Sequence, residues 1–239
     1  MAIKGLDCLL PIKDYVSLFS TFLNIFLNLS PIVIFIDIYK GKAKYTNIPP
    51  MMLIFSYLNN AIWGGYWYRK HEMSVFWCCF VCASIATIFS AWYLFYYTQK
   101  NLGKWVFFVL IQFSLEVFVV MIFFSDFISL TIVGILLIGI NAMQYASPAQ
   151  NLIKVIREKN CNLIPIVSTI LGALCSGGWL LFGLIMGDIN SIISNSLGCL
   201  SSILTTLVWF WIYCKYGKKE EKEKEEEAKE LVEKGDEKA

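Results

Sequence analysis

The fold is decided by the stretch from Tyr145 to Asn195, which reads YASPAQNLIKVIREKNCNLIPIVSTILGALCSGGWLLFGLIMGDINSIISN. Prolines, a tryptophan and polar residues interrupt its apolar runs at Pro148, Pro165, Trp179, Asp188 and Asn195. The first half of the chain repeats this pattern, because Pro148 lies 117 residues after Pro31 and Trp179 lies 116 residues after Trp63. Repetition at a nearly constant offset predicts two copies of one unit that face each other across a site.

The composition indicates a membrane protein. Of the 239 residues, 57% are hydrophobic and 16% are aromatic, whereas soluble domains are roughly 45–50% apolar. The eight cysteines show no metal-type pairs of pairs, so we expect no metal and no cofactor. No nucleophile is paired with a base and no glycine-rich phosphate loop is present, so neither an enzyme nor a nucleic-acid-binding protein is expected.

Apolar runs of about 20 residues bounded by charge predict transmembrane helices. They lie at 15–38, from Pro49 or Pro50 to 68, and at 73–97, 105–124, 127–153, 165–186 and 189–213. The predicted fold is all-α and integral to the membrane: seven transmembrane helices as two parallel three-helix bundles joined by a connector helix. The expected divisions are an N-terminus (1–14), a first repeat (15–98), a connector loop and helix (99–126), a second repeat (127–214) and a charged tail (215–239).

Charge in the short loops predicts the orientation of a multi-pass membrane protein. The loops after the first, third and fifth helices hold eight Lys and Arg residues, against two after the second, fourth and sixth. This asymmetry places the N-terminus outside and the C-terminus in the cytoplasm. We expect the plasma membrane, with an endomembrane as the alternative. The tail 215–239 is almost wholly charged and is predicted to be a solvated, partly helical extension.

Polar side chains are costly in hydrocarbon, so their placement is informative. Asn24 and Asn141 each lie seven residues before a proline of the repeat, and Leu27 and Gln144 lie on the same two helix faces. Amides offer donors and acceptors to hydroxyl groups. The alternative is that these amides only cross-link helices.

Two tryptophans complete this candidate pocket. Asn59 precedes Trp63 by four residues, and Cys175 precedes Trp179 by four residues on the equivalent helix. A flat indole face covers the C–H groups of a sugar. No carboxylate lies among these residues, which disfavours a cationic or proton-coupled substrate.

Four prolines are expected at one depth. Pro31 and Pro148 lie near the predicted cytoplasmic ends of their helices, while Pro49 (or Pro50) and Pro165 begin helices at the same side. Each proline removes a backbone hydrogen bond, so the set predicts a flexible ring at the cytoplasmic mouth. For the helix-starting prolines, ordinary helix initiation is the alternative.

Isolated charges have separate predictions. Glu116, with Gln112 one turn away, lies outside both repeats and is predicted to form an interhelical hydrogen bond. Asp188 is predicted to pair with Lys70 and to close the outer mouth.

These features together resemble the SWEET sugar transporters over about residues 15 to 216. The second-half motifs are Tyr145-Ala146-Ser147-Pro148, Pro165, Trp179, Asp188 and Asn195-Ser196-Leu197-Gly198. The first-half motifs are Leu29-Ser30-Pro31 and Leu58-Asn59-Asn60-Ala61-Ile62-Trp63. The resemblance implies a bidirectional uniporter that moves mono- or disaccharides down their gradient by alternating access. The expected partners are the sugar and the lipid bilayer, and a homo-oligomer is compatible with this function.

The resemblance also implies roles for single residues. It implies central sugar binding by Trp63, Trp179 and Asn195, and pocket lining by Asn24, Leu27, Asn59, Asn141, Gln144 and Cys175. It implies a proline tetrad of Pro31, Pro49 or Pro50, Pro148 and Pro165, and an outer gate of Lys70 and Asp188.

One position departs from the family pattern. The pocket asparagine of the third helix is missing, and the matching site falls at residues 79–81. We hypothesise that Asn59 reaches into the same space. Because Asn195 has no counterpart in the third helix, the second half is expected to be the more complete sugar-binding half.

Three alternatives remain. A proton-coupled PQ-loop amino-acid exporter would carry Pro-Gln dipeptides and pocket acids, but Ile32 follows Pro31 and Ala149 follows Pro148. A retrieval-type membrane receptor would need a basic cluster within the helices. A membrane enzyme would require Glu116 to act alone.

Overall fold

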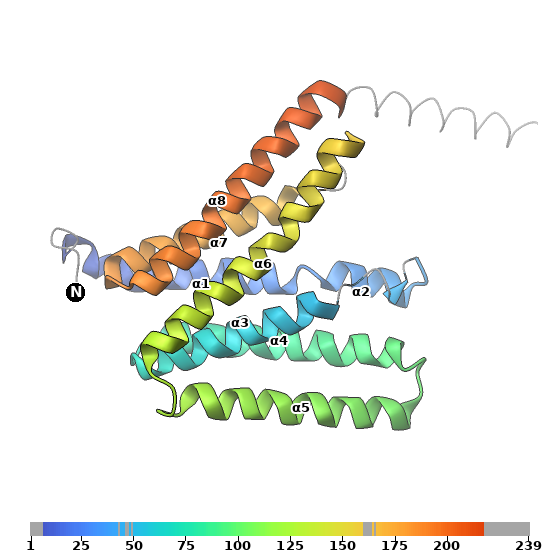
Figure 1. Ribbon diagram of the computed structural model, residues 1–239, viewed down its shortest axis with the longest axis horizontal. Helices are drawn as coiled ribbons and strands as arrows, with labels where there is room; N and C mark the ends of the chain where they lie inside the picture. The colour runs from blue at the N-terminus through green and yellow to red at the C-terminus, as the bar shows by residue number, and fades with distance from the viewer. Residues whose placement is uncertain are drawn as a thin grey trace, which may run out of the picture.

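The computed structural model describes residues 7–42, 44–45, 48, 50–159, 164 and 166–217. This part of the chain is helical and contains no β-strand. In order, the helices are α1 (Lys13–Leu29), α2 (Ile32–Tyr39), α3 (Pro50–Arg69), α4 (Met73–Tyr97), α5 (Leu102–Phe124), α6 (Leu130–Glu158), α7 (Ile166–Met186) and α8 (Ile189–Ile212) (Figure 1). A 3-10 turn, η1 (Asp7–Ile12), precedes α1, and a π turn, η4 (Tyr213–Gly217), follows α8.

The predicted helix bounds agree with the structure to within a few residues, with one division. The first predicted helix is split into α1 and α2 at Ser30 and Pro31. Pro31 has no N–H to donate, and the carbonyl of Leu27 instead accepts from the backbone N (3.2 Å) and hydroxyl (2.7 Å) of Ser30. The equivalent helix α6 continues through Pro148 without a break.

Five of the described segments are long and apolar enough to cross a membrane. They are Leu10–Tyr39, Met73–Tyr97, Leu102–Phe124, Ile166–Met186 and Ile189–Tyr216. Helix α5 buries none of its residues against the rest of the protein, as a helix that faces lipid would. Helices α3 and α6 are more polar, and the crossing of the membrane by these two stays a prediction.

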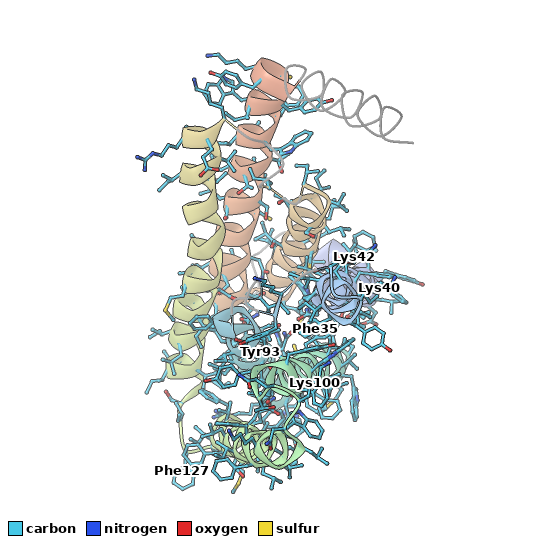
Figure 2. All side chains as sticks on the ribbon, turned by 90° about the vertical axis from the view of Figure 1, so that its right-hand side faces the viewer. Phe35, Lys40, Lys42, Tyr93, Lys100 and Phe127 are labelled. Carbon is cyan, nitrogen blue, oxygen red and sulfur yellow. The ribbon has the colours of Figure 1, made fainter. Side chains whose placement is uncertain are left out.

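The helices meet at one end of the molecule and diverge at the other. Helices α1, α3, α4 and α5 run roughly side by side, while α6 and α8 cross them at a steep angle (Figure 1). Figure 2 looks along the first group from the end that carries Lys40, Lys42 and Lys100, and shows α6 and α8 rising away from it. We refer to this as the Lys100 end, and to the opposite end as the Lys70 end.

The buried cores follow the same division. At the Lys70 end, one cluster joins helices of both halves, with Trp67 and Val75 from the first and Leu137 and Phe182 from the second. Toward the Lys100 end the clusters are separate: Phe35, Ile38, Ile48, Leu53 and Phe89 form one, and Val155, Ile164 and Ile212 form the other. The two halves therefore share a core only at the Lys70 end, as far as the described residues show.

Candidate functional site

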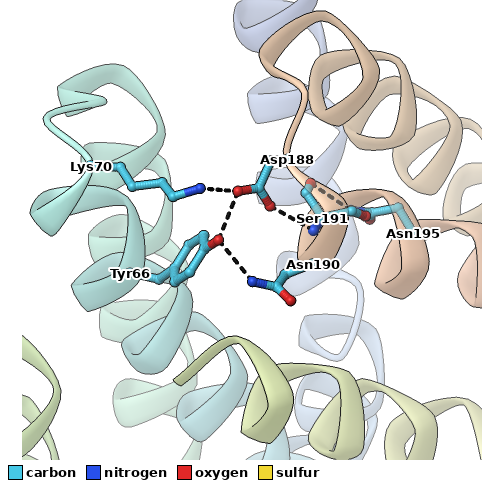
Figure 3. Close-up of polar contacts among 6 residues, drawn as sticks. All are labelled: Tyr66, Lys70, Asp188, Asn190, Ser191 and Asn195. Carbon is cyan, nitrogen blue, oxygen red and sulfur yellow. Dashed lines mark hydrogen bonds and ion pairs between the residues drawn. The ribbon is translucent and has the colours of Figure 1, made fainter. Parts of the chain in front are cut away.

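A polar cluster closes the Lys70 end (Figure 3). The ammonium group of Lys70 forms an ion pair with Oδ2 of Asp188, and the hydroxyl of Tyr66 donates to the same oxygen at 2.7 Å. The Nδ2 of Asn190 donates to the Tyr66 oxygen at 3.0 Å. The other carboxylate oxygen of Asp188 accepts from the backbone N of Ser191 at 2.7 Å and so caps α8. The cluster links the end of α3 to the start of α8.

Burial makes this cluster energetically important. Asp188 is only 4% exposed, and a buried carboxylate is stable only when it is paired and hydrogen-bonded. Burial alone lowers the pKa of Lys70, but its contacts with Asp188 and Tyr66 outweigh burial and raise that pKa above its ordinary value. The ammonium also lies 4.7 Å from the ring centroid of Tyr66 and 5.5 Å from that of Trp67. The structure contains the predicted Lys70–Asp188 pair, while its role as a gate stays a prediction.

The loop that carries Lys70 is tied to two further segments. Arg69 pairs with Asp126 at 3.2 Å and donates to the carbonyl of Ile128 at 2.7 Å. Glu72 pairs with Lys13 at the start of α1, also at 3.2 Å. The loop between α3 and α4 is thus anchored to α1, to the α5–α6 loop and to the start of α8.

The two predicted tryptophans lie in the shared core near this closure. Trp63 stacks on Trp67 with ring centroids 6.1 Å apart, and Trp179 meets Phe182 edge-on at 5.7 Å. Trp67 and Phe182 contact each other at 5.4 Å, which completes the chain of rings. The structure therefore brings residues 116 positions apart into one aromatic cluster. Trp63 is 9% exposed, so core packing explains much of its surroundings.

The predicted amide Asn24 belongs to a network that the sequence analysis missed. Asn28 donates through Nδ2 to Oδ1 of Asn24 at 3.1 Å, and its own Oδ1 accepts from Ser56 at 2.9 Å and from Asn60 at 3.3 Å. The Nδ2 of Asn24 reaches the sulfur of Cys78 at 3.7 Å. The i, i+4 spacing of Asn24 with Asn28, and of Ser56 with Asn60, was the signal that could have found this network.

On the third predicted helix, the residue that contacts Asn24 lies one position before the predicted site. Residues 79–81 were matched to the missing pocket asparagine, but Cys78 is the residue that faces Asn24. Cys79 lies in the shared core, where a Cβ on Gly64 would come within 3.4 Å of it. Val81 is 40% exposed on the outer face of α4. The thiol of Cys78 is therefore the α4 group that contacts Asn24, and the position of the missing asparagine at residues 79–81 stays a prediction.

Asn59 presents an unpaired acceptor. Its Oδ1 is buried and finds no donor among the described residues. Such an atom is costly unless a ligand or a water donates to it. This agrees with the hypothesis that Asn59 contributes to the pocket, which stays a prediction.

The second half holds its predicted residues on α6, α7 and α8. The Nδ2 of Asn195 donates to the carbonyl of Ser191 at 2.8 Å and to its hydroxyl at 3.2 Å. Asn141 and Cys175 are 4% and 5% exposed. On α1, Leu27 is half-buried. Outside the described residues lie Pro49, Pro165 and the side chains of Pro50, Gln144 and Pro148.

Glu116 of α5 forms the predicted interhelical hydrogen bond with Thr87 of α4, and a second bond with Gln112 of its own helix. Its carboxylate accepts from the hydroxyl of Thr87 at 2.8 Å and from the Nε2 of Gln112 at 2.7 Å. The Tyr57 hydroxyl also donates to its backbone carbonyl at 3.0 Å. Glu116 is thus held in a structural network away from the tryptophan cluster.

The fold and the site together define a multi-pass α-helical membrane protein with an ionic closure at one end. Residues 131–220 match the family described as "Sugar efflux transporter for intercellular exchange". In fold, the chain is similar to a solved structure of a eukaryotic SWEET transporter, with a TM-score of 0.68 and 20% identity over 85% of this chain and 99% of that one.

Curated relatives extend the match to both halves. The chain is 28% identical over 205 residues to the bidirectional sugar transporter SWEET1 of Arabidopsis thaliana, which covers 83% of this chain and 81% of the relative. It is 26% identical over 178 residues to the sugar transporter SWEET1 of Xenopus laevis, with 74% and 81% covered. The predicted resemblance to the SWEET family is therefore confirmed in sequence and in fold.

Proposed function

We propose that the protein is a bidirectional facilitative sugar transporter, a uniporter that moves mono- or disaccharides down their gradient by alternating access. The observation that carries the proposal is the aromatic cluster that joins Trp63 of the first half to Trp179 of the second, and that adjoins the Lys70–Asp188 pair through Tyr66. The proposal is also supported by two relatives that are named sugar transporters and whose matches cover 74% and 83% of this chain. This function requires no catalysis by the chain.

The division of the cores supports alternating access. The halves share a core at the Lys70 end and keep separate cores toward the Lys100 end, so this conformer is closed at the first and separated at the second. Opening of the Lys70 end requires that Asp188 release both Lys70 and Tyr66. We propose that repeats 15–98 and 127–214 move as two units around the connector 99–126.

We further propose the orientation and the hinges. The Lys70 end faces outward, and the Lys100 end and the tail 215–239 face the cytoplasm, in the plasma membrane or an endomembrane. The break at Pro31 supports a hinge there. The repeat contains three equivalent positions, which are Pro49 or Pro50, Pro148 and Pro165. With Pro31 they would form the cytoplasmic ring. A homo-oligomer is compatible with the bare outer face of α5.

In this proposal the sugar lies between the two halves. Trp63 and Trp179 would cover its C–H groups, and the amides of Asn24, Asn59 and Asn195 would bind its hydroxyls. Further pocket-lining positions are Leu27, Asn141, Gln144 and Cys175. Glu116 accepts from Thr87 and Gln112, so we propose a structural role for it rather than a place in the pocket.

Uptake of radiolabelled hexose by transporter-deficient cells tests the proposal. We expect saturable uptake that does not depend on pH between 5.5 and 8, and efflux from preloaded cells. The variant Asn195→Ala should lose uptake, whereas Ser114→Ala on the outer face of α5 should not. Amino-acid flux without any sugar flux would instead identify an exporter of the PQ-loop type.

A further inference from the structure

The amide network of α1 and α3 has a fixed donor–acceptor direction. We infer that Asn28, held by Ser56 and Asn60, is a positioning residue that presents the N–H of Asn24 to the sugar as a donor, while Asn195 presents an acceptor. This inference rests on the proposed function and assigns hydrogen-bonding roles within the same pocket.

Backbone carbonyls fix the direction of the network, because they can only accept. The carbonyl of Asn24 lies 2.8 Å from one side-chain atom of Asn28, which must therefore be the nitrogen Nδ2. In the same way, the carbonyl of Ser56 lies 2.8 Å from Nδ2 of Asn60 and orients that amide. The Oδ1 of Asn28 then receives both the Ser56 hydroxyl and the Asn60 amide. The contacts of Asn28 with Asn24, Ser56 and Asn60 are thus all consistent with one orientation of the Asn28 amide.

The consequence for Asn24 is a committed donor. Its Oδ1 is turned back to accept from Asn28 at 3.1 Å, so its Nδ2 points toward α4. The partner there is the sulfur of Cys78 at 3.7 Å, and sulfur is a weak acceptor. A sugar hydroxyl oxygen is a stronger acceptor, so binding of sugar would improve the hydrogen bonding of this amide.

In the second half the assignment is reversed, because the donor group of the Asn195 side chain is the one that is occupied. The Nδ2 of Asn195 is engaged by the carbonyl and the hydroxyl of Ser191, so Oδ1 is the atom that Asn195 has left to offer. The unpaired Oδ1 of Asn59 adds a second acceptor. One hydroxyl of the bound sugar should therefore accept from Asn24, and others should donate to Asn195 and Asn59.

Deoxy and deoxyfluoro sugars separate these roles, because fluorine can accept a weak hydrogen bond but cannot donate one. Each glucose analogue would be measured as a competitor of hexose uptake. At the hydroxyl that accepts from Asn24, the fluoro analogue should bind several-fold better than the deoxy analogue. At a hydroxyl that donates to Asn195, the two analogues should be equally poor.

The variant Asn28→Asp tests the positioning role. A carboxylate cannot donate, so Asn24 should turn its Nδ2 toward residue 28 and its Oδ1 toward the sugar. We expect the KM to rise by up to about tenfold with little change in maximal rate, because the sugar hydroxyl that is placed to accept from Asn24 must reorient to donate to its Oδ1. The fluoro advantage at the Asn24 position should disappear. Asn101→Asp is the matched control, because residue 101 caps α5 through an oxygen that both side chains possess.

The outcomes distinguish the inference from the proposed function. A wild-type protein without sugar transport would overturn both. Transport by Asn28→Asp with an unchanged fluoro-to-deoxy ratio at every position would overturn the inference alone. If Asn28→Asp does not reach the membrane, Asn28→Leu, which keeps the branched shape but has no polar atoms, decides. An unchanged KM and ratio would also overturn the inference, whereas a raised KM with a weakened ratio supports it.

Discussion

Replacement of Asp188 by asparagine should open the Lys70 end without unfolding the start of α8. Asparagine is as good an N-cap as aspartate, so the hydrogen bond from Ser191 can be kept while the charge that pairs with Lys70 is lost. The side chain of Asp188 is 3% exposed and that of Lys70 is 34% exposed. The cost of breaking the pair should therefore fall between the values for exposed and buried pairs, at about 2 kcal/mol.

That energy converts to a population shift that transport kinetics can measure. A cost of about 2 kcal/mol moves the ratio of outward-open to outward-closed protein by roughly 30-fold. Since apparent affinity scales with the fraction of protein open to each side, the ratio of external to internal half-saturation constants should fall by up to roughly that factor. The assay is hexose uptake and efflux in sealed vesicles of known orientation.

The control for Asp188→Asn is Asp126→Asn on the neighbouring ion pair. The side chain of Asp126 is 96% exposed, so its pair with Arg69 should contribute little and the affinity ratio should stay unchanged. The reasoning is refuted if Asp188→Asn reaches the membrane in normal amounts and shows the wild-type ratio. Equal shifts in both variants would also contradict it, because burial would then not decide the strength of the closure.

Three further predictions concern Lys70, Glu116 and Asn59. Because the pKa of Lys70 is raised, its contribution to closure is complete below about pH 10.4, its ordinary unfolded value, and is lost only as pH rises through the folded value, so the affinity ratio should be constant from pH 6 to 9. Glu116→Gln should leave hexose uptake and its pH independence unchanged, and a loss of uptake in protein at the membrane would contradict its structural role. Asn59→Ala should raise the KM for hexose several-fold, and normal uptake by Asn59→Ala beside a complete loss in Asn195→Ala would refute a contribution of Asn59 to the pocket.

The bounds of the helices could be predicted from the sequence because lipid imposes a length on each apolar run. Helix α4 begins at Met73 and ends at Tyr97, as predicted. The break between α1 and α2 could not be predicted, since Pro31 and Pro148 both follow a serine and only Pro31 divides its helix. A serine followed by a proline is therefore not enough to predict a break in the helix.

The pocket was harder to predict than the helices, because one residue of error rotates a helical side chain by about 100°. The repeat offset varies between 116 and 117 residues. Counted back from Asn195, the first offset gives Cys79, which packs in the shared core, and the second gives Cys78, which contacts Asn24. Asn28 was missed for a different reason. The repeat marks polar residues that occur in both halves, and Asn28 supports Asn24 from a position that the repeat does not mark.

At the start of α8, the two oxygens of the Asp188 carboxylate have separate partners, one set in the closure and one on the helix that carries Asn195. Asp188 uses Oδ2 for Lys70 and Tyr66, which belong to the other half, and Oδ1 for the backbone of Ser191, which belongs to its own helix. Ser191 in turn holds the amide of Asn195. Of the hydrogen bonds that Asp188 makes, opening of the Lys70 end would break only those of Oδ2, so α8 can stay capped and Asn195 can keep its orientation. If Asn195 binds the sugar as proposed, the sugar would meet the same acceptor from either side of the membrane, as a carrier that works in both directions requires.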